Sequence, residues 1–279
     1  MKKISALFSR AIAVLSVIAI TITTNANAAT ASDAEIYDLL DKSGATRTLE
    51  TLPMQMQMMG QQMALTAKDP QAHQDYMSIL LSSMDTDVMQ QRMLQSVRKN
   101  ATSEEIQAML VWLNSDLGQR IVAAETEATN PDFQQNMMQF MAGLQSNPPA
   151  PERTQAIIGY IEASKITDQT MKLIESLVAT MFDAAKALKP EDTQLAETLD
   201  IQLPQMMDMM KPALEQQMIL ASYYVYRDMS NEELAQYGGF YQKEIGKKHM
   251  SLIVESVSYA MNDWGESMMK QIIAEEDKS

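Results

Sequence analysis

Apolar residues recur at intervals of three and four along most of the chain, and this spacing places them on one face of an α-helix. In one such segment Ile106, Met109 and Leu113 follow the helical period. Residue types that favour helix, such as Ala, Leu, Met, Gln and Glu, are frequent. The 9 Gly, 9 Pro and 6% aromatic residues are too few for a fold of short strands and turns. The pattern therefore predicts an all-α protein.

Capping residues and prolines set the limits of the expected helices. Ser, Thr, Asp or Asn favours a helix start, and Gly or Pro favours a stop. On these signals we expect helices over residues 32–43, 46–66, 70–98, from 102 into a hairpin, from 130, 152–163, 167–188, 204–227, 230–243 and a last one that ends near residue 275. Pro53 should bend or restart the second helix, because proline removes a backbone hydrogen bond.

Two segments of this pattern are similar to each other. Residues 102–120 align with residues 230–248 without a gap, at a constant spacing of 128. The matched pairs are Thr102 with Ser230, Glu105 with Glu233, Trp112 with Phe240 (followed by Tyr241), Gly118 with Gly246, and Arg120 with Lys248. Because a cap, an aromatic, a glycine and a base recur in the same order, we interpret the segments as two copies of one helical hairpin.

Each copy opens with the pattern of a capping box. The hydroxyl of Thr102 or Ser230 can accept a hydrogen bond from the backbone of the first turn, and the glutamate three residues later can accept one in return. Capping explains the two glutamates better than catalysis does. Gly118 and Gly246 have two possible roles: each either ends the helix as its C′ residue or allows a close contact with the next helix.

The beginnings of the two copies also correspond, since Ser43 and Thr46 match Ser164 and Thr167 at a spacing of 121. Between the copies, a proline-rich stretch cannot continue a helix and favours an extended spacer. We therefore expect two tandem helical bundles related by internal duplication. The expected segments are a signal peptide at 1–28, a first helical domain at 29–144, a linker at 145–152 and a second helical domain at 153–279.

The first 28 residues have the features of a secretory signal peptide. Positive charge precedes a short apolar core and small residues at positions −3 and −1, supplied by Lys2, Lys3, Arg10, residues 11–20, Ala26 and Ala28. An uncleaved anchor is the alternative, but the apolar run is shorter than the about 20 residues that a membrane span needs. We predict cleavage after Ala28, a periplasmic location and no integral membrane segment in the mature chain.

Charge and composition exclude several functional classes. The whole sequence carries a net charge of −14, and removal of the leader would take away three basic side chains and no acidic one. Nucleic-acid binding needs a basic surface, so we predict no nucleic-acid partner. The sequence has no cysteine, which rules out disulfides and thiolate chemistry. The two histidines, His73 and His249, are too few for a multi-histidine metal centre.

The hairpin signature resembles domain of unknown function 2059, a family of small exported bacterial proteins. In that family the hairpin reads Phe-Thr-x-x-Glu-Leu, then Phe-Tyr, then Ser-Pro-x-Gly-x-Lys. The glutamate, an aromatic residue, the glycine and the base match in both copies here. Asp116 and Glu244 stand where the family has proline, and Lys243 replaces the serine in the second copy. The resemblance implies a helical fold and an exported location, and it brings no catalytic residues.

Methionine is the unusual feature of the composition, with 26 residues. Two clusters each place three of them on one helix face: Met56, Met59 and Met63, and Met206, Met209 and Met210. Three interpretations are open: flexible side chains that fill a core, soft thioether ligands for Cu(I), and a groove for apolar ligands, peptides or unfolded proteins. Core packing is the commonest role of such a stripe.

Common catalytic motifs do not occur in the sequence, which has no nucleophile elbow, phosphate-binding loop, dinucleotide fingerprint or His-Glu-x-x-His helix. Paired carboxylates such as Glu125 and Glu127 are expected to be solvated helix charges. We therefore predict no enzyme activity and no cofactor. The leading hypothesis is a protein-interaction module that binds an envelope protein or its own copy through apolar helix faces. Chaperone-like or apolar-ligand binding and Cu(I) binding are the alternatives.

Overall fold

The computed structural model describes residues 31–64, 70–130, 132–188 and 193–276. These ranges contain helices and no β-strand, so the predicted all-α class is confirmed. The helices are α1 (Asp33–Lys42), α2 (Ala45–Ala64), α3 (Pro70–Ser82), α4 (Thr86–Asn100), α5 (Ser103–Leu113), α6 (Asp116–Glu127), α7 (Phe133–Ser146), α8 (Pro151–Ser164), α9 (Ile166–Leu188), α10 (Thr193–Val225), α11 (Asn231–Gln242) and α12 (Glu244–Glu276). We refer to α1–α7 as the N-terminal half and to α8–α12 as the C-terminal half. The predicted signal peptide lies outside the described residues.

Local capping fixes the start of the hairpin helices. At α5 the Thr102 hydroxyl accepts from the Glu105 amide, and the Glu105 carboxylate accepts from the Thr102 amide. Ser230 and Glu233 form the same capping box at α11. Both predicted boxes are thus confirmed, and they satisfy amides that the first turn of a helix otherwise leaves without partners.

Two helix limits differ from the sequence prediction. The predicted helix over 70–98 is divided into α3 and α4, because Asp85 acts as a new N-cap and accepts hydrogen bonds from the amides of Asp87 and Val88. The helix expected from residue 130 begins at Phe133, after Asp132, whose side chain makes no capping hydrogen bond. At Asp85, a short polar side chain therefore starts a new helix where the sequence has neither Gly nor Pro.

Prolines lie inside two of the long helices, and one of them was expected at a helix start. The predicted helix over 204–227 begins at Thr193 instead, and both Pro204 and Pro212 lie inside α10. Pro53 likewise lies inside α2 without ending it. The two prolines of α10 are exposed, so water can reach the carbonyl groups that a proline leaves without an amide partner. An exposed proline weakens a helix without stopping it.

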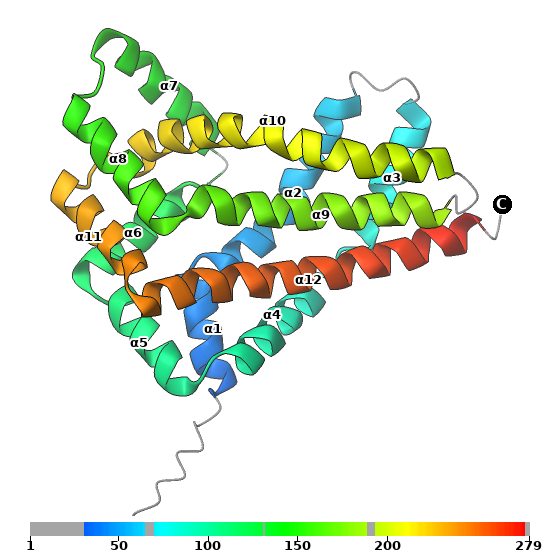
Figure 1. The fold of residues 1–279 in the computed structure, drawn as a ribbon, viewed down its shortest axis with the longest axis horizontal. Helices are drawn as coiled ribbons and strands as arrows, with labels where there is room; N and C mark the ends of the chain where they lie inside the picture. The colour runs from blue at the N-terminus through cyan, green and yellow to red at the C-terminus, as the bar shows by residue number, and fades with distance from the viewer. Residues whose placement is uncertain (1–30, 65–69, 131, 189–192, 277–279) are drawn as a thin grey trace, which may run out of the picture.

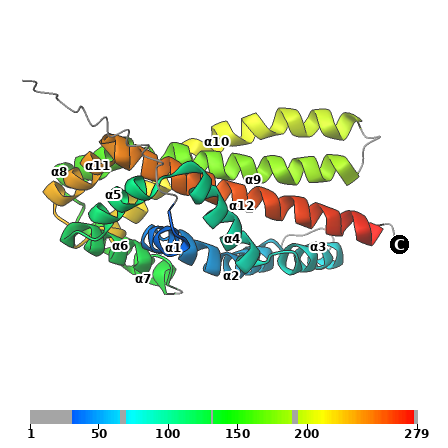
Figure 2. The ribbon, with the colours of Figure 1, turned by 90° about the horizontal axis from the view of Figure 1, so that it is seen from below.

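The long helix α12 lies between two layers of helices. In Figure 1 it runs beside α9 along the length of the molecule. The view turned by 90° shows α9 and α10 on one side of α12, and α2, α3 and α4 on the other (Figure 2). Its most extensive packing is against α4 and α9. Within the described ranges, none of the helices is both long and apolar enough to cross a membrane.

Two apolar cores hold the helices together, and each core contains a helix from the opposite half. The first core is built by α1–α5 and is completed by Leu252, Trp264 and Met268 of α12. The second core is built by α8, α11 and the region around the end of α10, and is completed by Ile121 of α6. The halves thus exchange helices, so that neither core is made by one continuous stretch of chain.

Candidate functional site

The aromatic residues of the two hairpins meet where the halves join. The rings of Trp112 on α5 and Phe240 on α11 stack with their centroids 4.3 Å apart and their planes 16° from parallel. Trp112 also stacks on Tyr237, at 5.3 Å. Trp112 and Phe240 are matched positions of the sequence repeat, so one residue contacts its own counterpart. Such a self-complementary contact is the geometry found on a two-fold axis.

Two ion pairs join the halves in a reciprocal way. Arg120 Nη1 lies 2.5 Å from Glu233 Oε1, and Lys248 Nζ lies 4.0 Å from Glu105 Oε1. Each base belongs to one copy of the hairpin, and each acid belongs to the other. The hydrogen bond from Arg120 is the main cause of the lowered pKa of Glu233. The two glutamates therefore have a second role beside capping, which is to join the halves.

The two matched glycines allow the hairpin to close tightly. Gly118 and Gly246 lie in the first turns of α6 and α12, so their role as C′ residues of the preceding helix is excluded. A Cβ atom at Gly118 would collide with the carbonyl oxygen of Trp112, and one at Gly246 would collide with that of Phe240. These contacts involve backbone atoms that cannot rotate away. Both glycines are therefore required for the close approach of successive helices.

The exchanged helices carry different side chains at matched core positions. On α6, the residues that face the second core are Ile121, which is 1% exposed, and Glu125 one turn later. On α12 the matched positions hold His249 and Ile253. Ile253 packs against the first core, and His249 is only 5% exposed. Each exchanged helix thus has one polar and one apolar side chain here, in opposite order.

Glu125 inserts its carboxylate into a cluster of tyrosines from the C-terminal half. The hydroxyls of Tyr226 and Tyr237 both donate to Glu125 Oε1, each at 2.8 Å. The hydroxyl oxygen of Tyr160 lies 3.0 Å from that of Tyr226, and the hydroxyl oxygen of Tyr241 lies 3.2 Å from that of Tyr237. We call these five residues the Glu125–tyrosine cluster. The prediction that Glu125 is a solvated charge is wrong, because neighbouring rings shield it.

Electrostatics in this cluster follow from burial. Burial raises the pKa of Glu125 above its usual value, and the hydrogen bonds from Tyr237 and Tyr226 only partly oppose this. Burial, together with the Glu125 charge, also raises the pKa values of Tyr226 and Tyr237 well above 10. The tyrosines therefore stay protonated and act as hydrogen-bond donors. Burial thus opposes ionisation of the Glu125 carboxyl as well as of the tyrosine hydroxyls.

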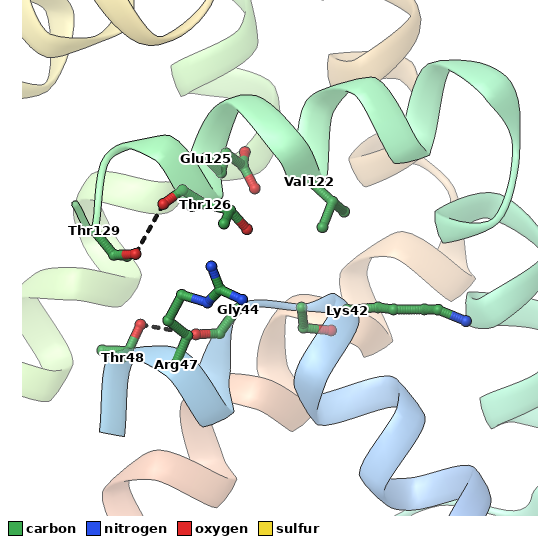
Figure 3. Close-up of a pocket in the computed structure, with 9 residues that line it drawn as sticks. Lys42, Gly44, Arg47, Thr48, Val122, Glu125, Thr126 and Thr129 are labelled. Carbon is green, nitrogen blue, oxygen red and sulfur yellow. Dashed lines mark hydrogen bonds between the residues drawn. The ribbon is translucent and has the colours of Figure 1, made fainter. Parts of the chain in front are cut away.

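A polar cavity of about 210 Å³ opens beside Glu125, between α6 and the turn that joins α1 to α2 (Figure 3). We call it the Arg47 cavity. The Arg47 guanidinium points across it towards α6, whereas the Lys42 ammonium points away and pairs with Asp38 at 2.9 Å. Hydroxyl groups, including that of Thr126, line the remaining wall. The cavity is therefore lined by the Arg47 guanidinium, which has no partner among the described residues, by the shielded Glu125 carboxylate and by several hydroxyls.

A second cavity touches Glu125 from another side. It has a volume of about 190 Å³ and is lined mainly by apolar parts of α8 and α10, including Ile161, Met218 and Val225. Glu125 thus stands between a polar and an apolar cavity. Within the described residues its Oε2 atom accepts no hydrogen bond, in contrast to Oε1, which accepts two.

A cavity at the matched place of the C-terminal half carries its charges on other positions. It is about 510 Å³ in volume and lies beside the turn that joins α8 to α9, and its charged lining residues are Glu162, Lys165 and Lys247. Gly44 and Lys165, at matched positions in the two turns, both have a positive φ, of 72° and 54°. Five lining residues of the Arg47 cavity, Lys42, Ser43, Gly44, Thr48 and Val122, match Ala163, Ser164, Lys165, Gln169 and Met250. The two cavities therefore occupy equivalent places but differ in the positions that carry charge.

A serine–histidine pair lies behind the wall of the Arg47 cavity. Ser43 Oγ lies 2.8 Å from His249 Nε2, and it donates its only proton to the Leu39 carbonyl at 2.7 Å. His249 Nε2 must therefore be the donor to Ser43, and cannot take the serine proton as a general base does. Burial lowers the pKa of His249 to about 4, so the ring is neutral. This geometry does not activate a nucleophile.

The methionine clusters divide between core and surface. Met56 is half-buried and packs against the first core. Met206 and Met210 are half-buried, and Met209 is 73% exposed. The side chains of Met59 and Met63 lie outside the described residues. In the described part of the chain, no group of three or more His, Asp or Glu side chains is placed to hold a metal ion.

The residues of this site gave only a weak signal in the sequence. The sequence pattern predicts Glu125 as a solvated helix charge, and it assigns His249 to no metal centre. The repeat itself contained the missing signal, since Glu125 matches Ile253 and His249 matches Ile121. A polar residue whose counterpart is isoleucine indicates burial of a polar group.

The comparisons with known proteins bear on one of the two hairpins. Neither a curated protein nor a solved structure matches the chain. Residues 87–147, from the start of α4 to the end of α7, match the family model of uncharacterized proteins conserved in bacteria (DUF2059). The match includes Thr102–Arg120 but not the second hairpin. The segment 87–147 is therefore similar to this uncharacterized bacterial family, as the hairpin signature indicates.

Proposed function

We propose that this chain is an exported, non-enzymatic protein-interaction module that binds another envelope protein through apolar helix faces. The observation that supports this is an apolar groove of about 260 Å³ between α2 and α3, lined by residues that include Gly60, Met77 and Leu81. Beside it on α2, Met54 and Met58 are 42% and 55% exposed. Exposed flexible thioether side chains adapt to partners of different shape.

Export is proposed from the leader pattern of residues 1–28 and from the family resemblance of the hairpin. The absence of enzyme activity is proposed because the Ser43–His249 pair is arranged with histidine as donor to serine, and because the Glu125 carboxylate is shielded by tyrosines. Both proposals fit the acidic, cysteine-free composition of the sequence.

We also propose that the two halves arose by duplication of one helical unit. The support is the set of reciprocal contacts: the self-stack of Trp112 on Phe240, the crossed ion pairs and the two glycine crossings. A homodimer of a single unit would make the same contacts across a true two-fold axis. Fusion of the units frees the matched positions to diverge, as Glu125 and Ile253 have done.

Site-specific crosslinking in the periplasm tests the interaction proposal. A photo-reactive amino acid is placed at Gln61, which lines the groove, and in a control at Ala108, which is exposed on α5. We expect a discrete adduct from the groove position only. The adduct should weaken when Ser78→Trp fills the groove, because the tryptophan would occupy the space of the partner side chain. Equal adducts at both positions, or none at Gln61, would contradict the proposal.

Chaperone-like binding of apolar clients is the second candidate, supported by the same groove. A hydrophobic dye should bind the folded protein and be displaced by apolar peptides, and Ser78→Trp should reduce both effects. A specific partner predicts instead that the dye binds weakly and that one envelope protein dominates the crosslinks.

Cu(I) binding is the third candidate, supported by three neighbouring thioethers at Met206, Met209 and Met210. Metal analysis of protein purified from the periplasm should find copper near one equivalent if this candidate is right. Replacement of the three methionines with leucine should then remove it. Copper well below one equivalent would dismiss the candidate.

A further inference from the structure

We propose that the Arg47 cavity binds a small zwitterion of amino-acid size, with the ligand carboxylate on Arg47 and the ligand ammonium on Glu125. This site is separate from the groove between α2 and α3, and it concerns a different class of ligand.

Both charged residues have unused hydrogen-bonding capacity. The Arg47 side chain has no hydrogen-bond or ion-pair partner among the described residues. A guanidinium group offers two parallel N–H donors that fit a carboxylate, and such bidentate pairs are among the stronger protein contacts. Glu125 Oε2 accepts no hydrogen bond in the described part of the chain, while Oε1 is held by two tyrosines. One anion receptor and one cation receptor thus line the same cavity.

Placement makes a direct ion pair between these two residues a poor alternative. Figure 3 shows Arg47 on the α2 wall and Glu125 on the α6 wall, on opposite sides of the opening. Glu125 is kept on its own side by the hydroxyls of Tyr226 and Tyr237. Arginine and glutamate are therefore separated by the cavity instead of neutralising each other. A ligand with opposite charges at its two ends would complete both.

The volume of the cavity limits the ligand to a small molecule. It measures about 210 Å³, against about 30 Å³ for the share of one water molecule in the liquid. Drug-sized ligands occupy cavities of roughly 300 Å³ or more. A free amino acid or a similar small amino-carboxylate fits this space. Hydroxyls of Thr48 and Thr126 on the two walls can bind the polar middle of such a molecule.

The counterpart cavity holds its charged groups elsewhere, on Glu162, Lys165 and Lys247. Asp168 stands at the position that matches Arg47, and it pairs with Lys211 at 2.7 Å. Ile253 stands at the position that matches Glu125. Folding of this unit therefore needs no cation at the first position and no carboxylate at the second. A shielded carboxylate costs free energy unless it has a compensating role, and ligand binding supplies one.

Protonation gives the proposal an independent signature. Burial raises the pKa of Glu125, and a bound ammonium group would favour its ionised form and lower that pKa. Zwitterion binding should therefore release a proton where Glu125 is partly protonated in the free protein. The affinity should rise with pH through that range, as long as the ligand amine remains charged.

Titration calorimetry on the full mature chain tests the proposal. The probes are the standard amino acids, with acetate, methylamine and inorganic phosphate as molecules that carry only one of the two charges. We expect at least one amino acid to bind in a saturable way, and acetate and methylamine to bind at least about tenfold more weakly. Binding of phosphate or acetate as tight as that of any amino acid would overturn the proposal, because Arg47 alone would then explain it. So would the failure of every amino acid to bind at about 10 mM.

Matched variants identify the cavity. Arg47→Gln and Glu125→Gln should each weaken binding by about tenfold or more, since each removes one charge contact. Asp168→Asn, at the matched place in the C-terminal half, should leave the affinity unchanged within about twofold. Far-UV circular dichroism checks that each variant is folded. The pH dependence of affinity should disappear in Glu125→Gln alone. Unchanged binding by either cavity variant, or an equal loss in Asp168→Asn, would overturn the proposal.

Discussion

The two halves of the molecule put different side chains into one and the same arrangement of helices. In the C-terminal half, Glu125 lies in a cluster of four tyrosines, three of which are Tyr160, Tyr237 and Tyr241. In the N-terminal half, the matched positions hold Leu39, Met109 and Leu113, and Ile253 packs against the core that they form. One half is thus closed by aliphatic contacts and the other by hydrogen bonds. Packing alone is enough to hold this junction together.

Of the two junctions, the polar one at Glu125 costs more free energy to bury than the aliphatic one at Ile253. Apolar burial stabilises without directional requirements. A carboxylate and several hydroxyls must instead find partners, and any group left without one costs about 1–3 kcal/mol. The His249 ring has the same cost, because its Nδ1 atom is buried without a partner among the described residues. Glu125 lines the Arg47 cavity, and His249 is joined to the same cavity through Ser43.

The largest effect is expected where the halves are most alike. Gly118→Ala and Gly246→Ala should each destabilise the fold by about 3–5 kcal/mol, because the new Cβ would meet a backbone carbonyl in both hairpins. Chemical denaturation followed by circular dichroism measures the change. Gly143→Ala is the control: nothing lies within 4 Å of its Cβ, so it should gain about 0.5–1 kcal/mol. A large loss at only one of the two matched glycines would break the equivalence of the hairpins.

The second prediction concerns the histidine of one half and the isoleucine of the other. The folded-state pKa of His249 is lowered from 6.5 to about 4, so its stabilising contribution is complete above pH 6.5. That contribution is lost as the pH falls towards 4, since only the unfolded chain takes up the proton in this range. The wild type should lose about 3 kcal/mol relative to His249→Ile between pH 7 and pH 4.

Parallel denaturation curves across this pH range measure that difference. Other titrating groups are common to both proteins and cancel. Ile121→Leu, at the matched position of α6, is the control, and its stability relative to the wild type should not change with pH. A constant difference between the wild type and His249→Ile would mean that His249 can be charged in the folded state.

Particular residues show which helix limits can be predicted from the sequence. The sequence predicts the capping boxes at Thr102 and Ser230 correctly, because a capping box depends only on residues within one turn. It predicts neither the N-cap at Asp85 nor the start of α10 before Pro204, because the same residue types cap, bend or merely interrupt a helix according to their exposure. Local patterns thus predicted the starts of the hairpin helices well and several of the other limits poorly.

The candidate site could not be derived from local patterns. An amphipathic helix needs an apolar partner surface, but its periodicity does not say which one. Nothing in the pattern of α6 or α12 indicates that each packs in the core of the other half. Because Glu125 is buried by that exchange, its shielding follows from the arrangement of the halves and not from its neighbours in sequence. Only the comparison of matched positions contained the information.

The third prediction converts the polar junction into the apolar one. Glu125→Ile should cost about 2 kcal/mol, because the hydroxyls of Tyr226 and Tyr237 lose their shared acceptor. Addition of Tyr226→Phe and Tyr237→Phe removes the unpaired hydroxyls and should restore the stability to within about 1 kcal/mol of the wild type.

Urea denaturation of the single and triple variants measures this recovery. The two tyrosine replacements without Glu125→Ile serve as the control, and they should destabilise because the carboxylate is then left without donors. A triple variant that is less stable than Glu125→Ile would show that the cluster is needed for folding. The polar junction at Glu125 would then be needed for folding, as the apolar junction at Ile253 is.

The smallest effect is expected at the reciprocal ion pairs. Arg120→Gln should lower the urea midpoint more than Lys248→Gln, because Arg120 lies 2.5 Å from its acid and Lys248 lies 4.0 Å from its own. Both side chains are partly solvent-accessible, so each effect should be modest. At about 1 M salt the screening length falls to about 3 Å, and the effect of either replacement should shrink.

Measurement at low and high salt separates charge from packing. A loss of stability that persists at high salt would assign the role of Arg120 to its contacts with the carbonyl of Asp228 and the sulfur of Met229. In that case the two ion pairs would not be equivalent, and the matched bases Arg120 and Lys248 would have different roles in the two hairpins.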